Sequence, residues 1–292
     1  MDTDLSLRIM SDLFKFMSSD FEEPDYLDLN DVELVIINLN SVFSTTFYES
    51  MIDVFNEDEE KMNSYVESIG DLFKQVLTYL SSQRIIMLYT DQVVNFVELY
   101  PDWKKERFKN KKKNKFAQKI YQHFIEVFNE IKTVNPTVDI INTGEFAPCI
   151  FVHGFINIRG YDKPVFLISR DRLDFLLLEN DNLIMFDGQE FYIGDKFEEH
   201  TVKKIPRINI HFLKYWYRIR GIKKYSYYGV RGKGPIRTKK YLEKNQDHII
   251  DGKSKYDDEK EMCIFDFDKY VNVFLKDDRY DKLVELINNT KF

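Results

Sequence analysis

The sequence predicts an α/β fold, with a mainly parallel β-sheet flanked by helices and a helical C-terminal region. Short apolar runs, typical of buried strands, alternate over the first two thirds of the chain with longer stretches whose apolar residues recur at helical spacing. Beyond about residue 206 the pattern becomes helical and basic. Strands that alternate with helices favour a parallel sheet, because parallel neighbours need a crossover connection.

The expected strands are short and almost continuously apolar, as strands buried on both faces are. They cover residues 33–38, 84–89, 138–141, 165–169, 183–186 and 191–193. The last two flank the turn Asp187-Gly188.

The expected helices fill most of the remaining chain. They cover residues 4–18, 57–82, 113–133, 145–158 and 277–289, with further helices after residue 206. The polar stretch from Lys244 to Lys260 is expected to form a mobile loop. The chain thus divides into an N-terminal helical extension (1–32), an α/β domain (33–205) and a helical region (206–292).

Positive charge is concentrated in two segments of an otherwise acidic chain. The formal net charge is −7, yet residues 104–119 carry a local +8 and residues 207–244 a local +11. Basic segments on an acidic body are typical of a surface that binds a polyanion such as nucleic acid. Two solvated helix faces would give the same pattern, so charge alone leaves both interpretations open.

The composition argues against a membrane or secreted protein. No run of about 18 apolar residues occurs, and the chain opens with Asp2 and Asp4 rather than with the basic stretch of a signal peptide. Cys149 and Cys263 are too few for a disulfide framework and show no metal-ligand spacing. We therefore expect a cytoplasmic protein with no membrane partner.

A glycine-rich loop carries the most specific motif. The glycines between Gly229 and Pro235 permit positive φ angles and close approach of another backbone. Pro235 suits the first turn of a helix, where its missing N–H costs nothing. The backbone amides at that helix start can hold a phosphate, and Arg237, Lys239 and Lys240 add positive charge. A loop that only caps a helix is the alternative.

This segment resembles the DNA-binding hairpin of the flap endonuclease/5′→3′ exonuclease superfamily. The family pattern G-D-x-x-D-N-I-P-G-V-x-G-I-G-P aligns without a gap to residues 221–235. The matching positions are Gly221, Gly229, Val230, Gly232, Gly234 and Pro235. The resemblance implies a PIN-like α/β domain, followed by a helix–three-turn–helix element that holds duplex DNA and often a potassium ion (K⁺) through backbone carbonyls.

Four further stretches resemble the family in the same order, within residues 33–275. Residues 35–43 resemble its opening strand, and residues 165–177 its strand and loop L-I-S-x-D-x-D-F-x-Q-L. Residues 98–107 resemble E-x-Y-P-x-Y-K-x-x-R, which implies that Lys104 and Arg107 face the substrate phosphates and serve catalysis in an active enzyme. Residues 263–268 resemble a closing stretch of the bacteriophage members often called ribonuclease H.

The metal-binding acids of the family are only partly present. Family members hold two divalent ions between clustered carboxylates, which activate water and stabilise the leaving oxygen. Here Asn38 replaces the first-strand aspartate, and Ile222 and Tyr225 replace the two hairpin aspartates. Two ions about 4 Å apart repel each other, so the loss of several negative charges leaves little to hold both.

The acids that remain would hold one Mg²⁺ or Mn²⁺ ion. Its ligands would be Asp91, Glu145, Asp171 and Asp174, with Asn38 as a neutral ligand. Asp174 lies one residue beyond the family position, which holds a leucine here. Asp91 fits only if the connection to Lys104 is shorter than usual, since strict counting places Tyr89 there. Asp91 and Asp171 could equally cap strand ends.

Histidines and aromatic residues are less specific. The five histidines share no short metal-ligand spacing, and His123 and His153 fall on apolar helical faces. An aromatic cluster surrounds the hairpin and could stack on unpaired bases, pack in the core or contact a partner. It comprises Tyr215, Trp216, Tyr217, Tyr225, Tyr227 and Tyr228.

Three functional hypotheses follow. The first is a non-catalytic DNA-binding protein derived from a 5′ nuclease, acting on duplex or branched DNA in phage-type replication, recombination or transcription. Replication or transcription proteins would be further partners, in the host cytoplasm if the source is a virus. The second is an active, divergent, structure-specific 5′→3′ exonuclease or flap endonuclease that uses two-metal hydrolysis. The third is a scaffold subunit without catalysis. The residues expected to contact nucleic acid are Gly229, Arg231, Gly232, Lys233, Gly234, Arg237, Lys239, Lys240, Lys109, Lys111 and Lys112.

Overall fold

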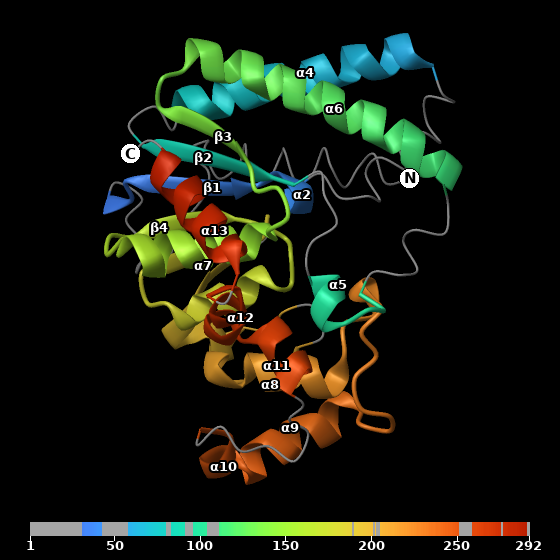
Figure 1. Cartoon of the computed structure of the whole chain (residues 1–292), viewed down its shortest axis with the longest axis vertical. Coiled ribbons are helices and arrows are strands. Elements are labelled where there is room, and N and C mark those ends of the chain that lie inside the picture. The colour runs from blue at the N-terminus through green and yellow to red at the C-terminus, as the bar shows by residue number, and fades with distance from the viewer. Residues whose placement is uncertain are drawn as a thin grey trace.

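The strands form a single sheet at the centre of the molecule (Figure 1). The computed structural model describes residues 31–42, 58–79, 83–90, 96–103, 111–188, 190–200, 202, 205–250, 259–275 and 277–290. The strands are β1 (Leu34–Asn38), β2 (Arg84–Tyr89), β3 (Val138–Asn142), β4 (Val165–Ile168), β5 (Leu183–Phe186) and β6 (Phe191–Ile193). Their order across the sheet is β3-β2-β1-β4-β5-β6, with β6 antiparallel to β5 and the other pairs parallel.

Helices and 3₁₀ segments connect and cover the strands. The first half contains α2 (Leu39–Val42), α4 (Glu59–Tyr79), α5 (Phe96–Leu99), α6 (Lys111–Val134), α7 (Pro148–Arg159), η3 (Asp174–Glu179) and η4 (Gly194–Glu199). The second half contains η5 (Ile210–Phe212), α8 (Leu213–Arg220), η6 (Lys223–Tyr225), α9 (Pro235–Lys244), α10 (Gln246–Ile250), α11 (Glu259–Phe265), α12 (Phe267–Phe274) and α13 (Asp278–Asn289).

Each strand contributes to two separate cores, because successive side chains of a strand point to opposite faces. In β1, Leu34 and Ile36 belong to the larger core, and Val35 and Ile37 to the smaller one. The smaller core lies between the sheet and the α4–α6 pair, and the larger core lies on the opposite face, between the sheet and α7 with the C-terminal helices (Figure 1). The apolar strand runs follow from this two-sided burial.

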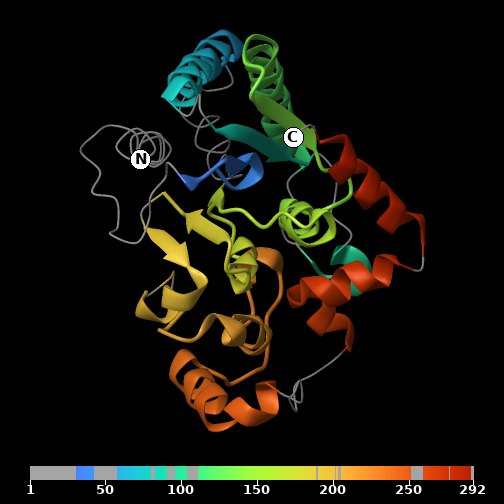
Figure 2. The ribbon, with the colours of Figure 1, turned by 90° about the vertical axis from the view of Figure 1, so that its left-hand side faces the viewer.

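The C-terminal helices continue the larger core away from the sheet. Figure 2 shows α8 to α10 below the strands, whereas α13 returns to lie beside α7. Leu283 and Ile287 of α13 are fully buried there, and Arg159 Nη1 donates to the carbonyls of Ile287 (3.3 Å) and Thr290 (2.9 Å). The last helix therefore stabilises the sheet domain as well as the helical region.

The expected α/β fold is confirmed, and all six strands lie where the apolar runs placed them. One expectation within residues 244–260 was wrong in part, because α10 forms there. Ile249 of α10 is buried, and its carbonyl accepts a hydrogen bond from the Tyr215 hydroxyl at 3.1 Å. Residues 1–30, including the expected helix 4–18, lie outside the described chain, and the three-region division stays a prediction.

Candidate nucleic-acid interface

Two glycines close the base of the hairpin between α8 and α9. Gly221 and Gly229 have φ angles of 75° and 63°. A Cβ atom on Gly229 would lie 2.5 Å from the Gly221 nitrogen and 2.6 Å from the Ile219 carbonyl oxygen. The two chain segments thus pass in backbone contact, which a side chain at either glycine would prevent. The expected close approach is present.

The tip of the hairpin is open in the way a backbone-binding loop requires. Cβ atoms on Gly232 and Gly234 would have no neighbour within 4 Å among the described atoms. Gly232 has φ of 78°, and Gly234 caps the N-terminus of α9 with Pro235 as its first residue. The amides of the first helical turn point out of the helix without intrahelical acceptors. They can therefore donate to an approaching phosphate.

Basic side chains surround this tip. Arg231, Arg237 and Lys240 are exposed, and Lys233 and Lys239 are half-buried. The Lys239 ammonium lies 3.7 Å from the Glu243 carboxylate, a surface pair of little energetic weight. The tip therefore combines the amides at the start of α9 with exposed positive charge. That these residues contact nucleic acid stays a prediction.

Two arginines already contact the carbonyls of the loop. Arg220 Nη1 donates to the Lys233 carbonyl at 2.5 Å, and Arg237 Nη1 donates to the Gly232 carbonyl at 3.4 Å. A potassium ion at the hairpin would compete with them for these oxygens. That ion stays a prediction.

The aromatic residues around the hairpin divide into a buried group and one exposed ring. Five are at most 6% exposed and pack in the core: Tyr215, Trp216, Tyr217, Tyr225 and Tyr227. Tyr228 is 55% exposed. Of the interpretations left open by the sequence, core packing holds for the five and a surface contact is possible only for Tyr228.

Asn38 is a buried amide at the position where the resemblance would place the aspartate of the first strand. Asn38, at the end of β1, donates from Nδ2 to Asp174 Oδ2 at 2.7 Å. The Ser169 hydroxyl donates to the same carboxylate oxygen and lies 2.9 Å from the Ser41 hydroxyl. Asp174 is 2% exposed. Burial, and then the negative charge of Asp171, raise the pKa of Asp174 to about 7.

Asp171 is bonded to the hairpin. Its Oδ1 accepts hydrogen bonds from the Leu173 amide (2.9 Å) and from the Tyr225 hydroxyl. Tyr225 is 1% exposed, and its ring stacks on Trp103 with centroids 4.7 Å apart. Tyr225 stands where the resemblance would place an aspartate, and its hydroxyl reaches Asp171, one of the acids that the resemblance assigns to the metal site. The sequence showed the replacement and gave no sign of the contact.

Neutral side chains line this edge of the sheet, where the carboxyl ends of parallel strands usually form ligand sites. Asn40 Oδ1 accepts from the Thr90 amide at 2.7 Å, and Asn40 Nδ2 donates to the Thr90 carbonyl at 3.1 Å. The Thr90 hydroxyl donates to the Gly144 carbonyl at 2.5 Å, and Asn142 Oδ1 accepts from the Gly144 amide at 2.9 Å. These groups bond to one another across the edge without adding negative charge.

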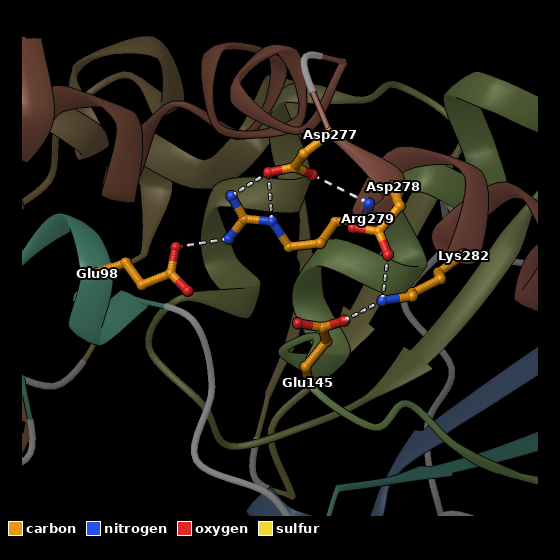
Figure 3. Close-up of polar contacts among 6 residues, drawn as sticks. All are labelled: Glu98, Glu145, Asp277, Asp278, Arg279 and Lys282. Carbon is orange, nitrogen blue, oxygen red and sulfur yellow. Dashed lines mark hydrogen bonds and ion pairs between the residues drawn. The ribbon is translucent and has the colours of Figure 1, made fainter.

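Glu145 lies against the C-terminal helix. Its Oε1 is 4.0 Å from the ammonium of Lys282, which also pairs with Asp278 at 2.7 Å (Figure 3). In the same view Arg279 joins Glu98 of α5, at 2.6 Å, to the N-terminus of α13. Glu145 therefore lies beside the cationic side chain of Lys282.

The described acids do not fit a metal ion as they stand. No group of three or more His, Cys, Asp or Glu side chains within the described residues is arranged to hold one. Asp174 is enclosed by its donors and Glu145 is paired with Lys282. Asp91, Lys104, Arg107 and Lys109 lie outside the described chain, and Lys111 and Lys112 begin α6 with side chains that are not described. A single-metal site that includes Asp91 stays a prediction.

His153 and His123 lie on helices, as expected. His153 Nε2 is 3.0 Å from Asp268 Oδ1, which joins α7 to α12. Burial lowers the pKa of His153, and the Asp268 carboxylate opposes that shift.

None of the helices in the described parts of the chain combines the length and apolar character that a membrane crossing requires.

Comparison with known proteins gives structural matches alone. No family model and no curated protein sequence matches the chain. Its structure is similar to that of the T5 D15 protein co-crystallised with metal ions (TM-score 0.59, 20% identity, covering 87% of this chain and 97% of that one). It is equally similar to a variant of the bacteriophage T5 D15 flap endonuclease in a pseudo-enzyme–product complex with DNA and metal ions (TM-score 0.59, 21% identity, covering 88% and 99%).

A third match is a variant of the T5 5′-exonuclease, with a TM-score of 0.55 and 20% identity over 87% of this chain and 97% of that one. These matches cover nearly the whole length of each matched chain and most of this chain, so they include the sheet as well as the helical region. The chain therefore has the fold of the flap endonuclease/5′→3′ exonuclease superfamily.

Proposed function

We propose that the chain is a DNA-binding protein with the fold of a 5′ nuclease and an impaired catalytic centre. It would hold duplex or branched DNA through the hairpin and the basic segment 104–119, in phage-type replication, recombination or transcription. The observation that carries the proposal is a contrast within one hairpin. Its tip is open to a phosphate backbone, whereas its Tyr225 lies in the core and donates to Asp171.

The binding half of the proposal rests on geometry and charge. Gly232 and Gly234 leave space for a backbone to approach, and exposed Arg231, Arg237 and Lys240 surround them. Contacts of this kind position a protein on phosphates and carry no base sequence. The structure of the T5 flap endonuclease variant with DNA adds support from a protein of the same fold.

The catalytic half rests on the residues at the carboxyl edge of the sheet. Two-metal hydrolysis needs several carboxylates with free oxygens. Asn38 and Tyr225 stand at two of those positions, and their own donor groups bond to Asp174 and Asp171. An ion at this edge would have to displace those donors. Metal affinity, and with it hydrolysis, should be weak.

A nuclease assay combined with a binding assay tests both halves. Cleavage of 5′-flap and nicked duplexes is measured with Mg²⁺ and with Mn²⁺, beside the Asp171→Ala variant, and binding to the same DNA is measured without cleavage. Binding without metal-dependent cleavage is expected. Cleavage that Asp171→Ala abolishes would establish an active, divergent 5′ nuclease instead. Absence of binding to either DNA would favour the scaffold hypothesis.

A further inference from the structure

One tyrosine of the hairpin points outward while its neighbours point inward. Tyr225 and Tyr227 are 1% and 3% exposed, and Tyr228 is 55% exposed. Ile236, just after Pro235, is 73% exposed. Large exposed apolar residues are few among the described residues, and these two lie at opposite ends of the glycine loop. A single exposed apolar side chain is ordinary, but a pair at the ends of a candidate binding loop suggests a contact surface.

The backbone that carries Tyr228 is held in place. A Cβ atom on Gly221 would lie 2.5 Å from the Tyr228 carbonyl carbon, so the end of α8 is in direct contact with it. The next residue, Gly229, is fixed by the same close approach, and the Val230 amide donates to the Ile219 carbonyl at 2.8 Å. An aromatic side chain on a fixed backbone loses little freedom on binding, which favours contact with a rigid partner.

The charged side chains near Tyr228 indicate the class of partner that the ring would contact. Arg231 of the same loop and Arg237 in the first turn of α9 are exposed cations, which favours an anionic chain as the partner next to the ring. Nucleic acid bases offer their flat faces only where they are unpaired or terminal, because a continuous duplex presents base edges in its grooves. We propose that Tyr228 stacks on an unpaired or terminal base beside the duplex, and so contributes affinity at DNA ends and junctions that it does not contribute on continuous duplex. This inference rests on the proposed DNA binding.

The test compares two DNA molecules of equal length and charge. One is a continuous duplex, and the other carries an unpaired 2-aminopurine next to the duplex, whose fluorescence falls when it stacks. Wild-type protein should bind the second more tightly and quench its fluorescence. Tyr228→Ala should lose about tenfold in affinity for the junction, with little change for the duplex, and should not quench. Tyr228→Phe keeps the ring and should behave as wild type.

The outcomes separate this inference from the proposed function. Equal affinity of Tyr228→Ala and wild type for the junction, or quenching by Tyr228→Ala, would overturn the role of Tyr228. An equal loss on both DNA molecules would overturn it too, since a general phosphate or groove contact would then explain the residue. If the wild-type protein binds neither DNA, the proposed function fails, and the inference fails with it.

Discussion

The Tyr225 hydroxyl donates a hydrogen bond to Asp171 Oδ1, across 54 positions of the chain. This contact joins the hairpin to the loop after β4, and the stacking of Tyr225 on Trp103 holds the ring in place. The Tyr225 phenol thus donates to Asp171 at a position where a second carboxylate would repel Asp171 unless a cation lay between the two.

Tyr225→Phe removes the hydroxyl and keeps the ring. We expect it to lower the free energy of unfolding by about 1.5–3 kcal/mol, since the hydrogen bond that it removes is made to a carboxylate. Urea unfolding measures the effect. Tyr228→Phe is the matched control on an exposed ring, and its effect should stay within about 0.5 kcal/mol. Equal stability of wild type and Tyr225→Phe would show that the hydrogen bond to Asp171 contributes nothing.

Asn38→Asp restores the family residue at the end of β1. The change replaces a donor to Asp174 with a second carboxylate in a buried position, so at neutral pH it should destabilise the protein by about 1–3 kcal/mol or more. Thermal unfolding with and without Mg²⁺ measures both the loss and any recovery. A large, Mg²⁺-dependent recovery of stability would mean that the remaining acids can hold a metal ion, contrary to the impaired site proposed above.

Gly229→Ala and Gly232→Ala test the base of the hairpin and its tip independently of each other. Both changes place a side chain at a positive φ angle, at a cost of about 1–2 kcal/mol. Only the first also forces a Cβ atom to within 2.5 Å of another backbone. We therefore expect Gly229→Ala to destabilise folding clearly more than Gly232→Ala in urea unfolding. Gly232→Ala should act mainly on DNA affinity. The reverse order of stabilities would contradict the close approach of Gly221 and Gly229.

Lys239→Glu combined with Lys240→Glu reverses two charges beside the tip. DNA affinity should fall, and the slope of log K against log salt should become shallower by about 0.9 for each phosphate that the protein no longer neutralises. Titrations at several salt concentrations measure both. Lys61→Glu with Lys74→Glu, on the exposed side of α4, is the matched control for total charge. A loss of equal size in the control would show that only net charge matters.

His153 gives the protein a pH dependence of known sign. Burial lowers its folded-state pKa below the usual 6.5, so the folded protein resists its protonation, although Asp268 and Asp266 oppose the shift. Its contribution to stability is present above pH ~6.5 and is lost as the pH falls through the folded-state pKa. Relative to His153→Gln, wild-type protein should lose more stability between pH 7.5 and pH 5 (roughly one unit above and below 6.5). Parallel losses in urea unfolding would contradict this.

The strands and the hairpin could be predicted because their signals are local. Continuous apolar runs such as residues 84–89 need burial on both sides, and the spacing of Gly229, Gly232 and Pro235 follows from backbone requirements. The bonds around the acids could not be predicted in this way. The contact of Asp174 with Asn38 and that of Asp171 with Tyr225 join residues more than 50 positions apart, and their geometry depends on the packing of the whole fold.

The close approach of Gly221 and Gly229 has an evolutionary consequence. Both positions must stay free of a side chain, because a Cβ atom on either glycine would push the two backbone segments apart. Gly232 and Gly234, at the tip, lie outside this constraint, since a Cβ atom on either would meet no described atom within 4 Å. In evolution the tip can therefore change by substitution, while the backbone contact that supports it stays the same.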